Sequence, residues 1–289
     1  MVVHPSGRRL VIGLELVKQA RRSRPWVLLG IMAAVPLLLT VVIGSTAPAL
    51  PERVGNFGSV VTGSSGFSMP LIVLSASVLF LLPLAVAVFA GEAVAQEAAW
   101  GSLRYLLARP IARWRVFAAK AAVAALFSLA AVITVAASSL ISGLLAFGWR
   151  PLTLLDLEHT SPFFVARVTL SSSAALETLA LATALVAGMM ASTLAFGLFL
   201  STLTRSPFAA AAGAVGFGLA SRALDNVPGL SALSPWLPMT DSGTSAWTGL
   251  FLQQPGWEAL GRLLLIQAAY TAVLLAAAWV RFSRADVLA

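Results

Sequence analysis

Residues 91–120 read GEAVAQEAAWGSLRYLLARPIARWRVFAAK, and they hold two Glu, four Arg and one Lys in a chain that is only 10% charged. They lie between two long apolar runs, 69–90 and 116–147, which predicts a short polar hairpin between two membrane spans. A helix from Glu92 to about Ala108 would place a polar row on one face and an apolar row beside it, before Pro110 breaks it. Glu97 and Arg104 of the polar row share their face with Gly101 and Ala108, and the apolar row is Trp100, Leu103 and Leu107. A patterned helix at the membrane surface indicates a docking surface for a soluble partner.

The composition is that of a polytopic membrane protein, with 59% hydrophobic residues over 289 positions and a mean hydropathy of +0.91. The net charge of +8 does not indicate nucleic acid as a partner, because the basic residues sit in short segments beside the apolar runs. The chain has no cysteine, and its only histidines are His4 and His159. Thiol chemistry is therefore excluded, and neither a histidine zinc site nor a histidine triad is expected.

Six apolar runs predict an all-α fold in which residues 1–289 form a single transmembrane domain. The predicted spans are 26–44, 69–90, 116–147, 176–203, 208–224 and 263–280. A signal peptide is the alternative for the first run, because a basic segment precedes it and small residues follow it. The run is longer than the usual apolar region of ~7–15 residues in such peptides, so we expect it to remain as a span.

The segments between the spans differ in character. Residues 1–25 predict an amphipathic helix on the inner membrane surface, with a solvated basic tail as the alternative. Its apolar face is Leu10, Leu14 and Val17, and its polar face is Glu15, Lys18, Gln19 and Arg22. Residues 45–68 and 149–173 predict outer loops, the second with a short surface helix. Residues 225–260, rich in Pro and Trp, predict an outer segment of short helices.

Two patterns orient the chain. The proposed inner segments hold 14 of the 19 Lys and Arg residues, and this asymmetry predicts that both termini are cytoplasmic. All eight tryptophans fall at or beyond the ends of the predicted spans, as an aromatic belt requires. We therefore expect a multi-pass protein of a bacterial-type cell membrane.

Two rows of small residues at four-residue spacing predict close helix packing in lipid. They are Ala184, Gly188 and Ser192 in the fourth span, and Ala212, Gly216 and Ala220 in the fifth. A chance distribution in an alanine-rich chain is the alternative.

The spans carry little chemistry of their own. No predicted span centre holds a charged residue, which argues against ion-coupled transport. Glu177, at the outer edge of the fourth span, is a weak candidate for the substrate path, with a solvated helix end as the alternative. The only lysines, Lys18 and Lys120, do not stand in a Gly-Lys-Ser/Thr sequence, so the chain has no phosphate-binding loop. We expect a protein that is not an enzyme, with no catalytic residues, no metal site and no cofactor.

The hairpin resembles the cytoplasmic segment of ABC-2-type permeases, the membrane subunits of a class of ATP-binding-cassette exporters. The most specific part of the likeness is Glu97-x3-Gly-Ser-Leu-Arg followed by Arg109-Pro110-Ile-x-Arg113. The turn 197–208 (GLFLSTLTRSPF) and the closing residues 282–286 are also similar, as is the six-span architecture. The likeness covers the whole chain, but no motif names a substrate.

The resemblance implies that the segment 91–115 carries a coupling helix that docks on a separate ATPase subunit. The resemblance assigns docking, together with the junction to the third span, to Glu92, Glu97, Gly101, Arg104, Arg109, Pro110 and Arg113, with Trp100 beside them on the docking face. ATP and Mg²⁺ would then be bound by two copies of the ATPase, with a second permease chain, identical or different, completing the assembly. A hairpin that only solvates Glu97 and Arg104 is the alternative.

The implied function is export of a hydrophobic or amphiphilic substrate, such as a drug, a lipid or a lipid-linked molecule. The alternatives are a nucleotide-independent secondary transporter or channel, and a membrane scaffold of the same architecture that moves no cargo.

Overall fold

The computed structural model describes residues 6–46, 59–61, 65–101, 112–156, 166–225, 227, 236–238, 250 and 256–284. Within these ranges the chain is mostly helical, and six helices are long and apolar enough to cross a membrane. These six are α2 (Ser23–Thr46), α4 (Leu81–Ala99), α6 (Arg113–Phe147), α7 (Ser172–Leu203), α8 (Pro207–Asp225) and α10 (Trp257–Arg284). The shorter helices are α1 (Ser6–Ala20) and α3 (Ser68–Leu79).

The predicted second span, 69–90, is wrong as a single helix. The structure divides it at Phe80 into α3 and α4, and α4 continues to Ala99. Pro83 accounts for the break, because it has no N–H to donate to the carbonyl of Leu79. That carbonyl instead accepts a hydrogen bond from Arg222 of α8 at 3.5 Å.

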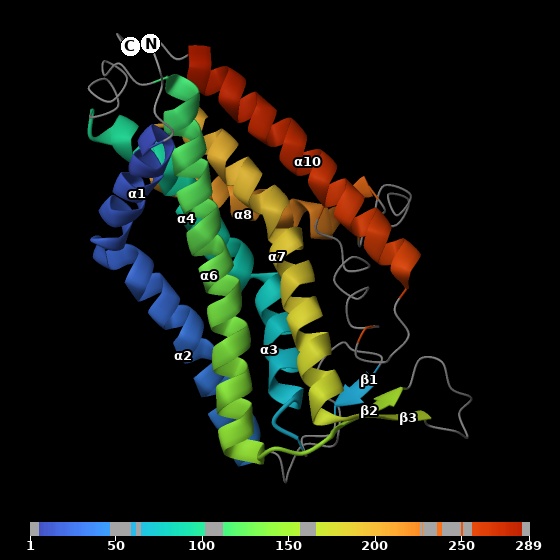
Figure 1. The fold of residues 1–289 in the computed structure, drawn as a ribbon. Coiled ribbons are helices and arrows are strands. Elements are labelled where there is room, and N and C mark those ends of the chain that lie inside the picture. The colour runs from blue at the N-terminus through green and yellow to red at the C-terminus, as the bar shows by residue number, and fades with distance from the viewer. Residues whose placement is uncertain are drawn as a thin grey trace.

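Helix ends from distant parts of the sequence meet at one end of the bundle (Figure 1). There Arg113, at the start of α6, donates to the Ser283 carbonyl near the end of α10 at 2.7 Å. The Ser201 hydroxyl of α7 accepts from the backbone N–H groups of Val94 and Ala95 in α4, each at 2.9 Å. We call this end, which also holds α1, the charged end.

A small antiparallel sheet lies at the opposite end of the bundle (Figure 1). Its strands are β1 (Ser59–Val61), β2 (Leu152–Asp156) and β3 (Ala166–Leu170), and β2 pairs with both neighbours. The short surface helix predicted within 149–173 is therefore wrong for 152–156 and 166–170, where the backbone is paired in strands. Most of the predicted outer segment 225–260 lies outside the described residues.

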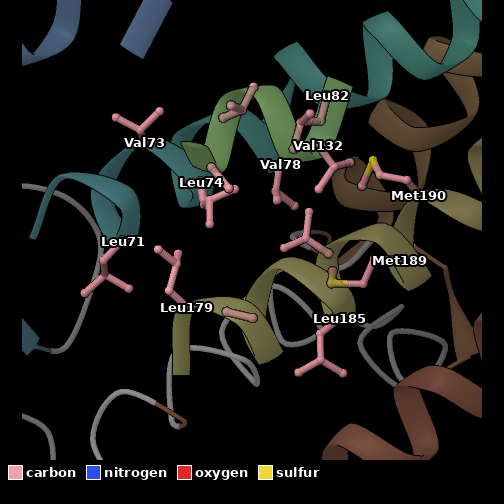
Figure 2. Close-up of a cluster of buried hydrophobic side chains, with 14 of the residues drawn as sticks. Leu71, Val73, Leu74, Val78, Leu82, Val132, Leu179, Leu185, Met189 and Met190 are labelled. Carbon is pink, nitrogen blue, oxygen red and sulfur yellow. The ribbon is translucent and has the colours of Figure 1, made fainter. Parts of the chain in front are cut away.

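The apolar core lies where α3, α4, α6 and α7 meet, as Figure 2 shows. Leu74 and Val78 of α3, Leu82 of α4, Val132 of α6 and Met189 of α7 are all almost fully buried there. By contrast, α2 and α10 are mostly exposed, because only 17% of the residues in the most apolar stretch of each helix are buried. Helices that are apolar on their exposed faces as well as inside are typical of membrane spans.

The two rows of small residues have different outcomes. A Cβ at Gly188 of α7 would lie 3.2 Å from the Leu264 side chain of α10, so the row of Ala184, Gly188 and Ser192 does border a close contact. The row of Ala212, Gly216 and Ala220 is exposed, and α8 instead approaches α4 through Ala211. The second row is therefore wrong as a packing face within this chain.

Candidate functional site

Four side chains of alternating charge form a closed ring at the charged end. Lys120 of α6 lies 2.8 Å from Glu97 of α4 and 3.1 Å from Glu15 of α1. Lys18 of α1 pairs with the same two carboxylates, bonding Glu97 directly and lying 3.9 Å from Glu15. We call these four residues the charge ring.

The inner half of the charge ring is buried. The side chains of Lys120 and Glu97 are 2% and 5% exposed, whereas that of Lys18 is 41% exposed. Removing a charge from water costs several kcal/mol, and two positive and two negative charges held together offset that cost. The chain has 17 arginines and only these two lysines. A compact ammonium with three donors can contact two carboxylates from different helices.

A second layer of polar contacts surrounds the charge ring. Arg22, between α1 and α2, donates to the Gln96 side chain, and its guanidinium lies 5.0 Å from the ring centroid of Trp100. Arg24, at the start of α2, lies 3.2 Å from Glu92. Together with the charge ring, these contacts hold the junction between α1 and α2 (residues 20–24) against the last two turns of α4.

Helix α1 is amphipathic, as predicted, but its polar face does not point to water. Glu15, Lys18 and Arg22 face α4 and α6, while Leu14 and Val17 are exposed on the other side. In a membrane protein an exposed apolar row at a helix surface fits lipid. The helix therefore binds the bundle through its charges and presents its leucine and valine side chains outward.

The chain leaves α4 earlier than the sequence pattern suggests. The helix ends at Ala99, Trp100 follows in a turn, and Gly101 has a φ of +65°. The helix predicted from Glu92 to about Ala108 is therefore interrupted at Trp100 and Gly101, and Gly101 does not share a helical face with Glu97, while 102–108 lie outside the described residues. The positive φ at Gly101 suits glycine, because other residues rarely adopt it.

The structure sorts the predicted site residues into three groups. Glu97 points toward Lys18 of α1 and Glu92 toward Arg24 at the start of α2, so the expectation of Glu97 on an outer face is wrong. Trp100 is 62% exposed beside the exit, and Arg113 joins α6 to α10. Arg104, Arg109 and Pro110 lie outside the described residues.

Glu177, the weak candidate for the substrate path, is exposed in the second turn of α7, next to the sheet. It is far along α7 from the charged end and is not part of the charge ring.

Sequence reasoning missed Glu15, Lys18 and Lys120 as partners of Glu97. Lys18 and Glu97 are 79 positions apart, and neighbouring residues give no sign of the contact. One signal was available: both lysines of an arginine-rich chain stand beside apolar runs, where a charge must find a partner.

A model of the family described as "Protein of unknown function (DUF2705)" matches residues 56–288. The chain belongs to this family. The DUF2705 match runs from β1 to the end of α10, so it includes Glu97 and Lys120 and leaves out Glu15 and Lys18. A comparison with curated proteins finds no match.

In this DUF2705 chain the charge ring connects the end of α4 to α1 and α6. Each member of the charge ring is an ion whose charge is matched, and the contacts join three helices. A displacement of the end of α4 would therefore be transmitted to α1 and α6 together.

Proposed function

We propose that the chain is the membrane subunit of an ABC-2-type exporter, driven by ATP that a separate ATPase subunit binds with Mg²⁺ and hydrolyses. The observation that carries the proposal is the position of the α4 exit. The end of α4 and the start of α6, which flank the polar segment, lie beside the charge ring, at the end of the bundle that also holds α1 and the end of α10.

This position suits a coupling element. A force applied to the segment after Trp100 would act on α4 and α6 directly, and on α1 through Lys18 and Glu97. The resemblance of residues 97–113 to the coupling segment of ABC-2 permeases supports the same role, with Trp100 and Arg104 on the docking side. Two ATPase copies and a second permease chain would complete the exporter in a bacterial-type cell membrane, with both termini cytoplasmic.

The distribution of charge favours an ATP-driven exporter over an ion-coupled one. In the described part of the six candidate spans, every charged residue lies within eight residues of a helix end. Proton and ion relays place such residues deep in the membrane. The apolar interior and the apolar outer faces fit a hydrophobic or amphiphilic cargo, such as a drug, a lipid or a lipid-linked molecule.

The test is co-purification with an ATPase. The tagged chain, extracted in mild detergent from cells that naturally produce it, is expected to bring down a protein with a phosphate-binding loop and ATP-hydrolysing activity. Arg104→Glu with Arg109→Glu should reduce the recovered ATPase at least about tenfold, a loss of roughly 1.4 kcal/mol of binding. Arg205→Glu with Arg281→Glu is the matched control, because both arginines are exposed and lie near the ends of α7 and α10 that meet at the charged end.

Undiminished recovery with the first pair would contradict docking at this segment. Recovery of no ATPase from any variant would favour the second candidate, a nucleotide-independent carrier or a scaffold of the same architecture.

A further inference from the structure

Three buried polar atoms on α7 and α10 lack a hydrogen-bond partner among the described residues. They are the Ser192 hydroxyl, the side-chain carbonyl oxygen of Gln267 and the Thr271 hydroxyl. Ser192 is fully buried and Gln267 is 1% exposed. We call these three residues the polar seam.

Hydroxyl groups elsewhere in the spans do not behave in this way. Ser128, Thr134 and Thr183 each donate to the carbonyl four residues earlier in their own helix, at 2.7–2.8 Å. That bond is the ordinary solution for a hydroxyl in a helix. Ser192 and Thr271 do not make it, so their hydroxyls stay available.

The three residues share one helix interface. Ser192 lies one turn after Gly188, where an added Cβ would lie 3.2 Å from the Leu264 side chain of α10. Gln267 and Thr271 follow Leu264 by three and seven residues, so all three lie on one face of α10. Ser192 and Gly188 likewise share the face of α7 that meets it.

Helices α7 and α10 run in the same direction, so residues further along α7 lie opposite residues further along α10. Nearer the charged end, Phe199 of α7 packs with the cluster that contains Ala278 and Phe282 of α10. Along both helices, the contact of Gly188 with Leu264 thus precedes the polar seam, and the contact of Phe199 with the Ala278 and Phe282 cluster follows it. Ser192 is therefore opposite the stretch between Gln267 and Thr271.

Such groups are costly where they stand. A buried polar atom without a partner costs about 1–3 kcal/mol, and a membrane supplies no water to relieve it. The amide nitrogen of Gln267 donates to the Pro238 carbonyl, which leaves the side-chain oxygen as a free acceptor. Leucine, alanine and valine at the three positions would avoid the whole cost. Polar groups kept at this cost inside a membrane mark a functional site.

We infer that the polar seam binds the uncharged hydroxyl or amide group of an amphiphilic cargo during export, when α7 and α10 separate. The inference rests on the proposed exporter function. The seam offers one acceptor and two hydroxyls that can donate or accept, and it holds no charge, so it fits a neutral polar group. The close contact of Gly188 with Leu264 shows that the seam is closed in this conformation.

The absence of cysteine from the chain allows a direct test. In membranes of cells that produce the protein with its natural partners, Ser192→Cys and Thr271→Cys are exposed to 2-hydroxyethyl methanethiosulfonate. This reagent carries an uncharged hydroxyl. The cysteine thiolate attacks the divalent sulfur that carries the hydroxyethyl group, forming a mixed disulfide and releasing methanesulfinate. The thiolate forms only where polar groups or water surround the thiol.

Two single-cysteine variants are the controls. Val186→Cys places the thiol in the buried apolar core on the same helix, and Val273→Cys places it on the exposed apolar face of α10. We expect both seam thiols to react at least about tenfold faster than the two controls, the factor that corresponds to roughly 1.4 kcal/mol in the cost of opening. Rates equal to those of the controls at both seam positions would overturn the inference.

The outcome is separable from that of the proposed function. Slow seam thiols in a chain that still recovers its ATPase would overturn the seam alone. Fast seam thiols in a chain that recovers no ATPase would overturn the exporter, and with it the export cargo assigned to the seam.

Discussion

Lys120 is the residue on which the charged end depends most. Its ammonium is buried and contacts two carboxylates that come from different helices. Replacing it by methionine removes one positive charge and leaves Glu97 and Glu15 to share the more exposed Lys18. We expect Lys120→Met to lower the stability by about 3 kcal/mol, because breaking a buried ion pair strands the other charge. Thermal unfolding of the purified protein in detergent measures the loss.

Two further variants make that prediction specific to the charge ring. Glu97→Gln added to Lys120→Met leaves the neutral pair of Glu15 and Lys18, so most of the lost stability should return. Arg205→Met removes an exposed charge at the same end and should change little. If Lys120→Met unfolds at the same temperature as Arg205→Met, the buried ring contributes nothing measurable and this account of the charged end is wrong.

At this scale the sequence predicted some environments and not others. Five tryptophans at or just beyond the ends of the described helices, such as Trp26, Trp114 and Trp257, are exposed, as an aromatic belt requires. Glu97 was expected on an outer face because helical spacing shows only neighbours along the chain. Its partners, Lys18 and Lys120, come from other helices, so tertiary packing alone brings them together.

The crossing of α4 and α8 depends on the absence of a side chain. A Cβ at Gly91 would lie 2.9 Å from the Ala211 nitrogen and 3.0 Å from the Pro207 carbonyl oxygen, both backbone atoms. We expect Gly91→Ala to lower the stability by roughly 1–3 kcal/mol, because the helices would have to move apart. A shift of the thermal midpoint in detergent measures it.

Gly216→Ala is the matched control for this crossing. Nothing lies within 4 Å of a Cβ at Gly216, so alanine should be neutral or slightly stabilising through its higher helix propensity. Equal effects of the two substitutions would show that α4 and α8 do not approach as closely as described.

The elements themselves were largely predictable, because long apolar runs determine where spans occur. The runs at 116–147 and 176–203 correspond to α6 and α7 within a few residues. The break at Phe80 was missed because the residues around it are apolar throughout. Pro83 was the available signal for the break. The strands β2 and β3 were missed because each is only five residues long and pairs outside the spans.

At the scale of the whole molecule, the multi-pass architecture follows from composition, whereas the polar seam does not. Ser192 and Gln267 are single polar residues in apolar runs, and nothing near them in the sequence shows that they face each other. The resemblance to ABC-2 permeases adds an assembly that one chain cannot display, which is two permeases with two ATPases.

The mass of the intact complex tests the central claim most directly. Native mass spectrometry of the protein, purified in mild detergent from its own cells, should find two permease chains, this 30.0 kDa chain with a second identical or related one, and two ATPase subunits. The added mass of the ATPases should fall away in the Arg104→Glu/Arg109→Glu variant. A particle that contains only the 30.0 kDa chain, in any number of copies, would contradict the account.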